Sequence, residues 1–252
     1  MGNTAKQKNI LITRSKENAA ELVKTLEEAG FKVFCEPLLT IEKFKSSPAF
    51  LAQNSAKISA AIITSSNACD ALVESKLSRD LKIFSVGKST SKKLTDFGFT
   101  NLETAVPENA KSLLELIKKN HNNSGVIAYF HGSSITLDFA AELKKSKIEV
   151  VKIPAYQANE IENFSAEFLE LNAAEKFFDY VLIFSSKSAE IFLKMASQHN
   201  LLAYFNSSNL LCLSQQICQK IIKISDKNHQ IKFANIASFD DLPILRKFYV
   251  WS

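Results

Sequence analysis

The chain of 252 residues contains few of the patterns that make nucleotide, metal or hydrolase sites. Only six glycines are present, and they form neither the GxGxxG fingerprint of dinucleotide-binding folds nor the GxxxxGKS/T loop of P-loop proteins. The four histidines are scattered along the sequence, and no serine stands in a GxSxG elbow. We therefore predict no metal site, and no pattern supports a Ser-His-Asp triad.

Charge of one sign is not concentrated either. The chain has 31 basic and 26 acidic residues, a net charge of +5, and none of its Lys/Arg runs resembles a nucleic-acid-binding arm. Together with the lack of Cys/His finger spacings, this argues against a nucleic-acid-binding protein. The small positive excess would suit an acidic small molecule, although the simpler interpretation is that most lysines solvate helix faces.

Long hydrophobic runs and paired cysteines are also missing. The longest apolar runs, such as residues 181–184, have the length of a strand and not of a membrane span. Residues 1–9 are polar and lack the apolar core of a signal peptide. The four cysteines have no CxxC spacing and lie in apolar surroundings, which is typical of reduced core thiols: they are Cys35, Cys69, Cys212 and Cys218. We predict a cytoplasmic protein without membrane contact.

The sequence does contain an internal repeat. A shift of 117 residues places the run 10–14 over 127–131, and a shift of 121 places 62–68 over 183–189. Two shifts of similar size are typical of a duplicated unit with small insertions. Such a duplication predicts two similar rims, which can face each other across a cleft that binds a small ligand.

Apolar periodicity predicts strands that alternate with helices. Strands are expected at 10–13, 31–35, 58–64, 81–86, 101–104, 126–130, 148–153, 180–184, 210–213 and 231–234. Helices are expected between Ser15 and Gly30 and at 68–74, 91–97, 111–119, 135–145, 188–196, 215–222 and 240–248. This alternation is typical of parallel sheets that are covered by helices on both faces. The predicted fold class is therefore α/β, with two sheets.

The order of the strands predicts a discontinuous domain. The two strands in 10–35 are too few to form a stable sheet alone, whereas residues 58–153 contain five. We therefore expect one α/β domain of residues 1–37 and 160–252, and an inserted α/β domain of residues 43–153. Residues 38–42 and 154–159 would form a two-stranded hinge.

Polar turns follow four of the predicted strands. They are Thr64-Ser65-Ser66-Asn67, Lys88-Ser89-Thr90, Ser185-Ser186-Lys187-Ser188 and Ser214-Gln215-Gln216. At the carboxyl edge of an open parallel sheet, helix N-termini present free N–H groups and partial positive charge to anionic ligands. The alternative is that these residues are ordinary helix N-caps without a ligand. Because the turns occur in paired positions, we expect several of them to contact a carboxylate or phosphate.

The order and spacing of the motifs resemble those of the uroporphyrinogen-III synthase family. The resemblance covers nearly the whole chain, and its landmarks are Thr13-Arg14, 64–68, 86–90, 154–157 and 184–186. It implies two α/β domains joined by a two-stranded hinge. It also implies a lyase of tetrapyrrole (haem) biosynthesis that cyclises hydroxymethylbilane to uroporphyrinogen III, with inversion of ring D and loss of water. No cofactor is implied, and the implied partner is this polycarboxylate substrate. No long exposed apolar stripe is predicted, so we expect a monomer.

The turns and the resemblance together predict the site residues. The expected substrate-binding residues are Arg14, Thr64, Ser65, Ser66, Asn67, Lys88, Thr90, Ser186, Lys187, Ser188 and Gln216. Tyr156 matches the tyrosine of the family's returning hinge strand and is the expected proton donor to the leaving hydroxyl, the alternative being a tyrosine that only packs. Ser214, Ile217 and His131 stand where the family usually has glycine, threonine and arginine. The alternative function is therefore a non-catalytic two-domain binding protein for an anionic small molecule.

Overall fold

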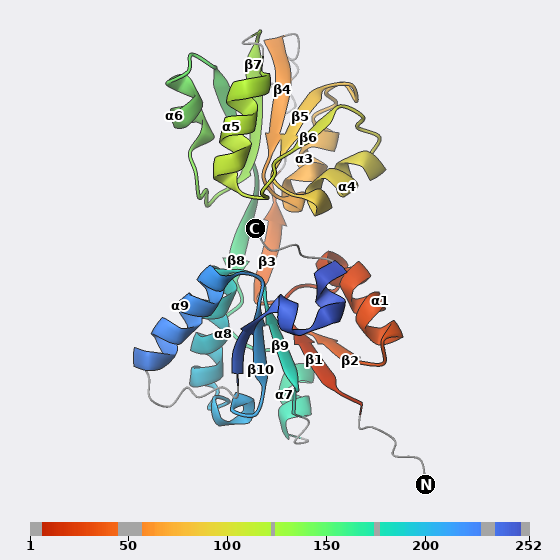
Figure 1. Ribbon diagram of the computed structural model, residues 1–252, viewed down its shortest axis with the longest axis vertical. Coiled ribbons are helices and arrows are strands. Elements are labelled where there is room, and N and C mark those ends of the chain that lie inside the picture. The colour runs from red at the N-terminus through yellow and green to blue at the C-terminus, as the bar shows by residue number, and fades with distance from the viewer. Residues whose placement is uncertain (1–6, 45–56, 122–123, 174–176, 228–234, 248–252) are drawn as a thin grey trace. The chain divides into compact units, whose positions relative to one another are not determined.

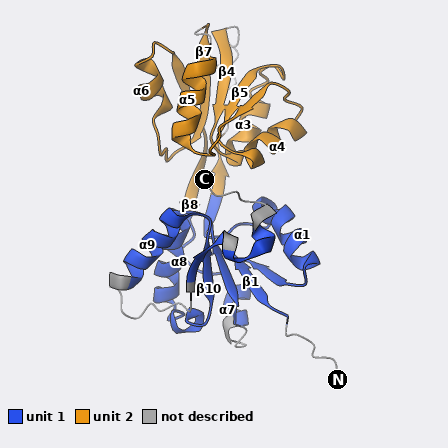
Figure 2. Cartoon of the chain, in the orientation of Figure 1, with its two compact units in different colours: residues 1–40, 160–251 blue, residues 41–159, 252 orange. Residues whose placement is uncertain are grey.

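The structure is a computed structural model that describes residues 7–44, 57–121, 124–173, 177–227 and 235–247 (Figure 1). The chain divides into two compact units, which Figure 2 colours separately. Unit 1 contains residues 1–40 and 160–251, and unit 2 contains residues 41–159 and residue 252. Each unit is a mainly parallel sheet with helices on both faces, so the predicted α/β fold class is confirmed.

Unit 1 is built on a sheet of five parallel strands in the order β11-β10-β9-β1-β2. The strands are β1 (Asn9–Ile12), β2 (Lys32–Cys35), β9 (Tyr180–Ile183), β10 (Asn209–Cys212) and β11 (Asn235–Ser238). The helices are α1 (Ala20–Glu28), α7 (Ala166–Ala173), α8 (Ser186–Gln198) and α9 (Gln215–Lys227). Successive strand residues point to opposite faces. Leu11 and Val181 pack with α7, α8 and α9, whereas Ile10 and Leu182 pack with α1.

Unit 2 contains a sheet of six strands in the order β3-β8-β7-β4-β5-β6. The strands are β3 (Leu39–Lys43), β4 (Ile58–Ile63), β5 (Lys82–Ser85), β6 (Leu102–Thr104), β7 (Val126–Gly132) and β8 (Val150–Glu160). The helices are α3 (Cys69–Glu74), α4 (Lys88–Asp96), α5 (Ala110–Asn120) and α6 (Phe139–Lys144). Residues of α3 and α4 cover one face, and residues of α5 and α6 cover the other.

The chain passes from one unit to the other along β3 and β8. Phe44 donates its backbone N–H to the carbonyl of Ala155, and Ile161 donates to the carbonyl of Leu38, so these two strands run antiparallel. Strand β8 continues through Pro154, where the sequence predicted that it would end. The proline is tolerated because the register with β7 shifts directly after it, and a proline at such a bulge does not interrupt a regular ladder.

Three other elements differ from the sequence prediction. Helix α6 is shorter than the predicted 135–145, because the carboxylate of Asp138 accepts the N–H of Ala141 and caps the helix there. The predicted helix 240–248 is wrong: the described residues form the 3-10 turns Phe239–Asp241 and Pro243–Lys247, since the proline interrupts helical hydrogen bonding. Helix α7 was not predicted. The predicted strand 231–234 lies outside the described residues, and β11 follows it.

The internal repeat is visible in the strand registers. In unit 1, Ile10 is paired with Val33, and in unit 2 the residues 117 positions later, Ile127 and Val150, are paired in the same way. The helices α1 and α6 also end alike, at residues with positive φ: Gly30 (88°) and Lys147 (59°), again 117 positions apart. The repeat therefore describes a real strand-helix-strand unit.

The two copies of the repeat do not correspond to the two units. The first copy places β1 and β2 in unit 1 but β4 in unit 2, whereas the second copy places β7 and β8 in unit 2 but β9 in unit 1. As a result, the central pairs are β1 with β9 in one sheet and β7 with β4 in the other. Each sheet is therefore assembled from halves of both copies.

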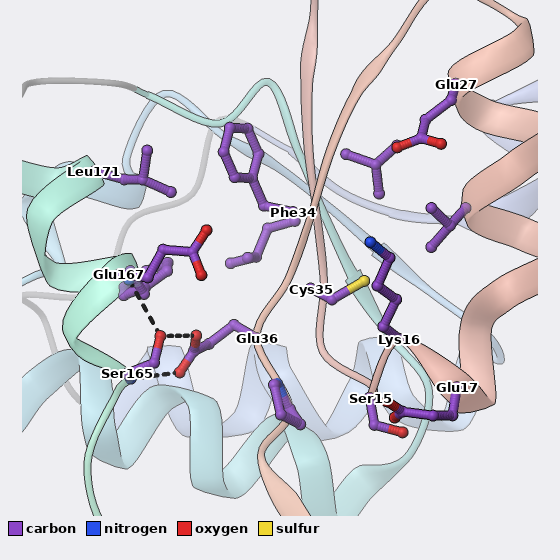
Figure 3. A pocket seen from close by; sticks show the side chains of 15 residues that line it. Ser15, Lys16, Glu17, Glu27, Phe34, Cys35, Glu36, Ser165, Glu167 and Leu171 are labelled. Carbon is purple, nitrogen blue, oxygen red and sulfur yellow. Dashed lines mark hydrogen bonds between the residues drawn. The ribbon is translucent and has the colours of Figure 1, made fainter.

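In unit 1, a buried carboxylate joins the segments before and after the inserted unit. Glu36 is only 4% exposed, and its carboxylate accepts the N–H (2.7 Å) and the hydroxyl (2.6 Å) of Ser165 (Figure 3). The hydroxyl oxygen of Ser165 in turn accepts the N–H of Phe168 and caps α7. Burial raises the pKa of Glu36, and the bonds from Ser165 oppose this shift.

We predict that Glu36→Ala lowers the free energy of unfolding by about 1–3 kcal/mol, because it removes both acceptors and leaves the Ser165 N–H unsatisfied. Glu36→Gln keeps one acceptor and should cost less. The folded pKa is raised, so the contribution of Glu36 is fully present below its unfolded pKa of about 4.3 and is lost as pH rises through the folded pKa. The free energy of unfolding of Glu36→Gln, relative to that of the wild type, should therefore increase from pH 4 to pH 7.

Urea denaturation at the two pH values measures both effects. The exposed Glu28, paired with Lys24 at 3.8 Å on α1, provides a control: Glu28→Ala should cost less than about 0.5 kcal/mol. Equal losses for the alanine variants of Glu28 and Glu36 would contradict the role given to the buried carboxylate.

Candidate functional site: the carboxyl edges of the two sheets

In unit 2, the turn after β4 forms the N-terminus of a helical segment. Ser65 is extended, and its hydroxyl accepts the N–H of Asn67 at 3.3 Å, which caps the 3-10 turn Ser66–Ala68 ahead of α3. The carbonyl of Ser66 accepts a hydrogen bond from the ammonium of Lys93 at 3.1 Å. The turn is therefore held by one cap and one ionised donor, and its side chains are half-buried.

The residue that begins this turn is bonded to a neighbouring strand. Thr64 hydrogen-bonds through its side chain to Tyr129 of β7, a tyrosine that is 2% exposed. Burial raises the pKa of Tyr129, and the bond with Thr64 works in the opposite direction. Sequence reasoning missed Tyr129, because a tyrosine inside a buried strand has the same pattern as a core residue.

The next turn, after β5, is the first turn of α4 and not a separate loop as predicted. Lys88 begins the helix and is exposed, and it has no ion pair or hydrogen-bond partner in the described part of the chain. Thr90 is 4% exposed, so its side chain lies inside the unit. A carboxylate already faces this helix end: a Cβ on Gly87 would lie 2.7 Å from Oε2 of Glu108. Sequence reasoning did not identify Glu108.

Tyr156 lies at the same edge of unit 2. Its ring covers Gly132 so closely that a Cβ at that position would be 2.7 Å from Cζ and 2.9 Å from the hydroxyl oxygen. The backbone N–H of Ser133 donates to the carbonyl of Tyr156 at 2.9 Å and fixes the strand beside it. The hydroxyl of Tyr156 makes no hydrogen bond to any other described residue. The tyrosine is thus packed through its ring and leaves a donor at the hydroxyl.

His131 is buried beside Tyr129 and is not available at the surface. It is 8% exposed, its Nδ1 lies 2.7 Å from the carbonyl of Gly132, and its ring is 5.0 Å from that of Tyr129. Because the carbonyl can only accept, Nδ1 carries the proton. The other nitrogen, Nε2, is buried without a partner among the described residues.

In unit 1, the turn after β1 carries a cation. The guanidinium carbon of Arg14 lies 4.0 Å from the centre of the Phe184 ring, a geometry that stabilises a cation against an aromatic face. The preceding Thr13 is buried, and its hydroxyl donates to the carbonyl of Leu182 at 2.7 Å. The two contacts join the ends of β1 and β9 and place Arg14 at the carboxyl edge.

Helix α8 begins at this edge, directly after β9. Ser185 is its N-cap: the hydroxyl accepts the N–H of Ser188 at 3.0 Å and is 2.8 Å from the hydroxyl of that residue. The side chain of Ser188 is therefore buried, and its hydroxyl and N–H already have Ser185 as their partner. The first N–H groups of a helix have no partner within it, and the cap leaves those of Ser186 and Lys187 for a ligand. The ammonium of Lys187 forms an ion pair with Glu160.

The third turn of unit 1 follows β10. The carbonyl of Ser214 accepts the N–H groups of Ile217 (3.0 Å) and Cys218 (3.1 Å) at the start of α9. Ile217 is 5% exposed and belongs to the core, which explains how an apolar residue can replace a polar one there. Gln216 is exposed on the first turn of the helix.

The cysteines are free thiols, three of them buried, and burial raises the pKa of Cys69 to about 12.

The structure thus brings the predicted residues together in two groups, one in each unit. Arg14, Ser186, Lys187, Ser188 and Gln216 lie on the adjacent strand ends β1, β9 and β10. The other group lies on the adjacent ends of β8, β7, β4 and β5, and it consists of Tyr156, Thr64, Ser65, Ser66, Asn67, Lys88 and Thr90. Both groups consist mainly of helix N-termini, which favour anions.

A cavity of about 370 Å³ lies in unit 1, on both sides of β2 (Figure 3). Four carboxylates line it, those of Glu17, Glu27, Glu36 and Glu167, with Lys16 between them. A cavity lined in this way repels a polycarboxylate, so it does not suit the predicted substrate. In the described residues, no group of three or more His, Cys, Asp or Glu could hold a metal ion. None of the described helices is long and apolar enough to cross a membrane.

The comparison with protein families identifies one family. The family model of uroporphyrinogen-III synthase HemD matches residues 5–232. A mutant uroporphyrinogen III synthase from Thermus thermophilus is 15% identical, with 96% of this chain and 97% of that chain covered and a TM-score of 0.54. Uroporphyrinogen-III synthetase from Helicobacter pylori is 14% identical, with 90% and 92% covered and a TM-score of 0.56. At these identities the solved structures support the fold. Among curated proteins, none matches the chain.

Proposed function

This chain belongs to the uroporphyrinogen-III synthase family, and we propose that it cyclises hydroxymethylbilane to uroporphyrinogen III with inversion of ring D. The observation that carries the proposal is the family match over residues 5–232. The local geometry supports it, since the substrate bears eight carboxylates and the strand ends of each unit present helix N-termini and cations.

We assign the binding of carboxylates mainly to backbone N–H groups. The donors left by the Ser185 cap, on Ser186 and Lys187, are the clearest of them. Arg14 adds a cation that its contact with Phe184 holds in place. Binding of this kind positions the open tetrapyrrole so that the substituted carbon of ring D attacks first, and positioning is the main catalytic contribution expected here.

The chemical step that we propose is a dehydration and ring closure. The pyrrole nitrogen of ring A donates electrons toward the hydroxymethyl carbon, which breaks the bond to the hydroxyl group. The Tyr156 hydroxyl donates a proton to this leaving group, so that it departs as water. The substituted carbon of ring D then bonds to the resulting methylene carbon and gives a spiro intermediate. The bond between the substituted carbon and the original bridge to ring C then breaks, and the bridge bonds to the unsubstituted α-carbon of ring D. Loss of the proton on that carbon restores the pyrrole and balances the proton that Tyr156 donated. No oxidant or reductant is consumed, and the reaction is that of a hydro-lyase.

The proposed function is tested by incubating the protein with fresh hydroxymethylbilane and separating the product isomers. The uncatalysed closure gives the type I isomer, so a protein-dependent excess of type III supports the proposal. If the protein binds hydroxymethylbilane and leaves the isomer ratio unchanged, it is the alternative binding protein and the proposed reaction is wrong.

We predict that Tyr156→Phe lowers the rate of type III formation by roughly ten- to a thousandfold, with the low end favoured because the leaving group is already activated. The phenylalanine ring keeps the packing over Gly132, so this change isolates the hydroxyl. The isomer ratio should stay near that of wild type, since carboxylate contacts determine it.

Tyr180→Phe is the matched control, because this tyrosine begins β9, at the opposite end from the candidate site. Among the described residues, its hydroxyl accepts a hydrogen bond only from exposed Lys8. Its rate should be unchanged. Full activity of Tyr156→Phe would identify a packing residue, and release of mostly type I product would identify a positioning residue instead of an acid.

We further predict that Ser186→Pro raises the KM about tenfold or more, because it deletes a backbone donor to a carboxylate. Proline is tolerated at the first position of a helix, and the cap from Ser185 to Ser188 remains. Ser186→Ala keeps the N–H and should leave the KM within about twofold of wild type. Steady-state kinetics of both variants separates backbone from side-chain recognition. A large effect of alanine with none of proline would make the hydroxyl the ligand.

A further inference from the structure

A shared carboxylate joins three elements of unit 2. Asp70, in the first turn of α3, accepts from Lys43 of β3 at 2.7 Å and from Lys93 of α4 at 3.2 Å. The same ammonium of Lys93 donates to the carbonyl of Ser66 at 3.1 Å. The contacts form one connected chain from the strand by which the polypeptide enters unit 2 to the turn after β4.

The carboxylate is the most protected member of this group. The side chain of Asp70 is 22% exposed, against 36% for Lys93 and 61% for Lys43. Burial alone would raise the pKa of Asp70, but the hydrogen bonds and charges of the two lysines hold it below its usual range. Asp70 is therefore ionised at neutral pH and bonded to both cations.

A second contact joins the same two turns of the candidate site. The thiol of Cys69, next to Asp70, lies 4.0 Å from the carbonyl of Thr90 in the first turn of α4. Lys93 is one helical turn further along α4. The start of α4 is thus tied to the start of α3 by a buried sulfur contact and by the bonds of Lys93.

We propose that Asp70 is a positioning residue that fixes the turn Ser65–Asn67 against β3 and α4, so that the N–H of Ser66 meets a substrate carboxylate. Asp70 holds Lys93, and Lys93 holds the carbonyl of Ser66. Without the carboxylate, the side chain of Lys93 is no longer held by an ion pair, and its hydrogen bond to the carbonyl of Ser66 no longer fixes the position of the turn. This inference rests on the proposed function, because it concerns the same substrate and the same strand ends.

Electrostatics alone makes a different prediction for two substitutions. Asp70→Asn removes a negative charge near the turn, so a pure charge effect would tighten the binding of an anionic substrate. Lys93→Met removes a positive charge and would weaken that binding. The positioning role predicts that both changes weaken binding, since each breaks the connection to Ser66. The two explanations therefore predict opposite changes in substrate binding for Asp70→Asn.

The experiment compares the wild type with Asp70→Asn and Lys93→Met in the full chain. We expect both variants to raise the KM by about three- to tenfold, as loss of one or two partly exposed ion pairs allows, with a smaller change in kcat and a larger type I fraction. Lys43→Met leaves the Lys93 contacts in place and should show a smaller rise. Glu115→Gln breaks the exposed Lys118–Glu115 pair on α5 and should change nothing.

Amide hydrogen exchange gives a readout that does not depend on activity. The amides of residues 66–68 should exchange at least about threefold faster in Asp70→Asn and Lys93→Met than in wild type, while those of Glu115→Gln stay the same. A lower KM for Asp70→Asn, or unchanged exchange in both variants, overturns the positioning role. If the wild type forms no type III product, the proposed function fails, and the exchange data still decide whether Asp70 holds the turn.

Discussion

Parallel pairing of strands brings their carboxyl ends to one edge of a sheet, and the candidate site of this protein depends on that constraint. In unit 1 the ends of β10, β9 and β1 are adjacent, and in unit 2 those of β8, β7, β4 and β5 are adjacent. Because helices follow β4, β5, β9 and β10, their N-termini gather at the same edges. Residues far apart in sequence, such as Arg14 and Ser186, thereby become neighbours in the fold.

The repeat shows how one short strand-helix-strand unit supplies both edges. Its two copies retain the register of their strand pairs and the left-handed residue that ends their helix, yet they contribute to different sheets. Their turns have diverged: Arg14 lies on an aromatic ring, whereas His131, at the equivalent position, is buried against the carbonyl of Gly132. Backbone donors are insensitive to such changes. A candidate site built mainly from helix N-termini therefore keeps the backbone donors that the proposed carboxylate binding requires while its side chains vary.

Several residues that hold elements together within a unit are not among those expected to form the site. Glu36, Asp70 and Tyr129 were not singled out in the sequence, because their partners Ser165, Lys43 and Thr64 are distant in the chain or lie on other elements. A buried carboxylate that accepts from Ser165, the residue that caps α7, and a carboxylate shared by two lysines have no local pattern. Conversely, Thr90 and Ser188 matched the expected motif, but their side chains are buried and Ser188 is bonded to Ser185. Motif residues thus divide into those that cap helices and those that leave donors for a ligand.

Patterns within the sequence predict the α/β class, the alternation of strands and helices, the internal repeat and the position of each polar turn at a strand end. Local patterns contain this information, since the period of apolar residues and the chemistry of helix caps act within a few residues. The order of the strands, the continuation of β8 through Pro154 and the packing of Tyr156 over Gly132 could not be predicted from these patterns and are seen in the folded chain. These features depend on contacts between residues distant in sequence, where register and burial outweigh local preference.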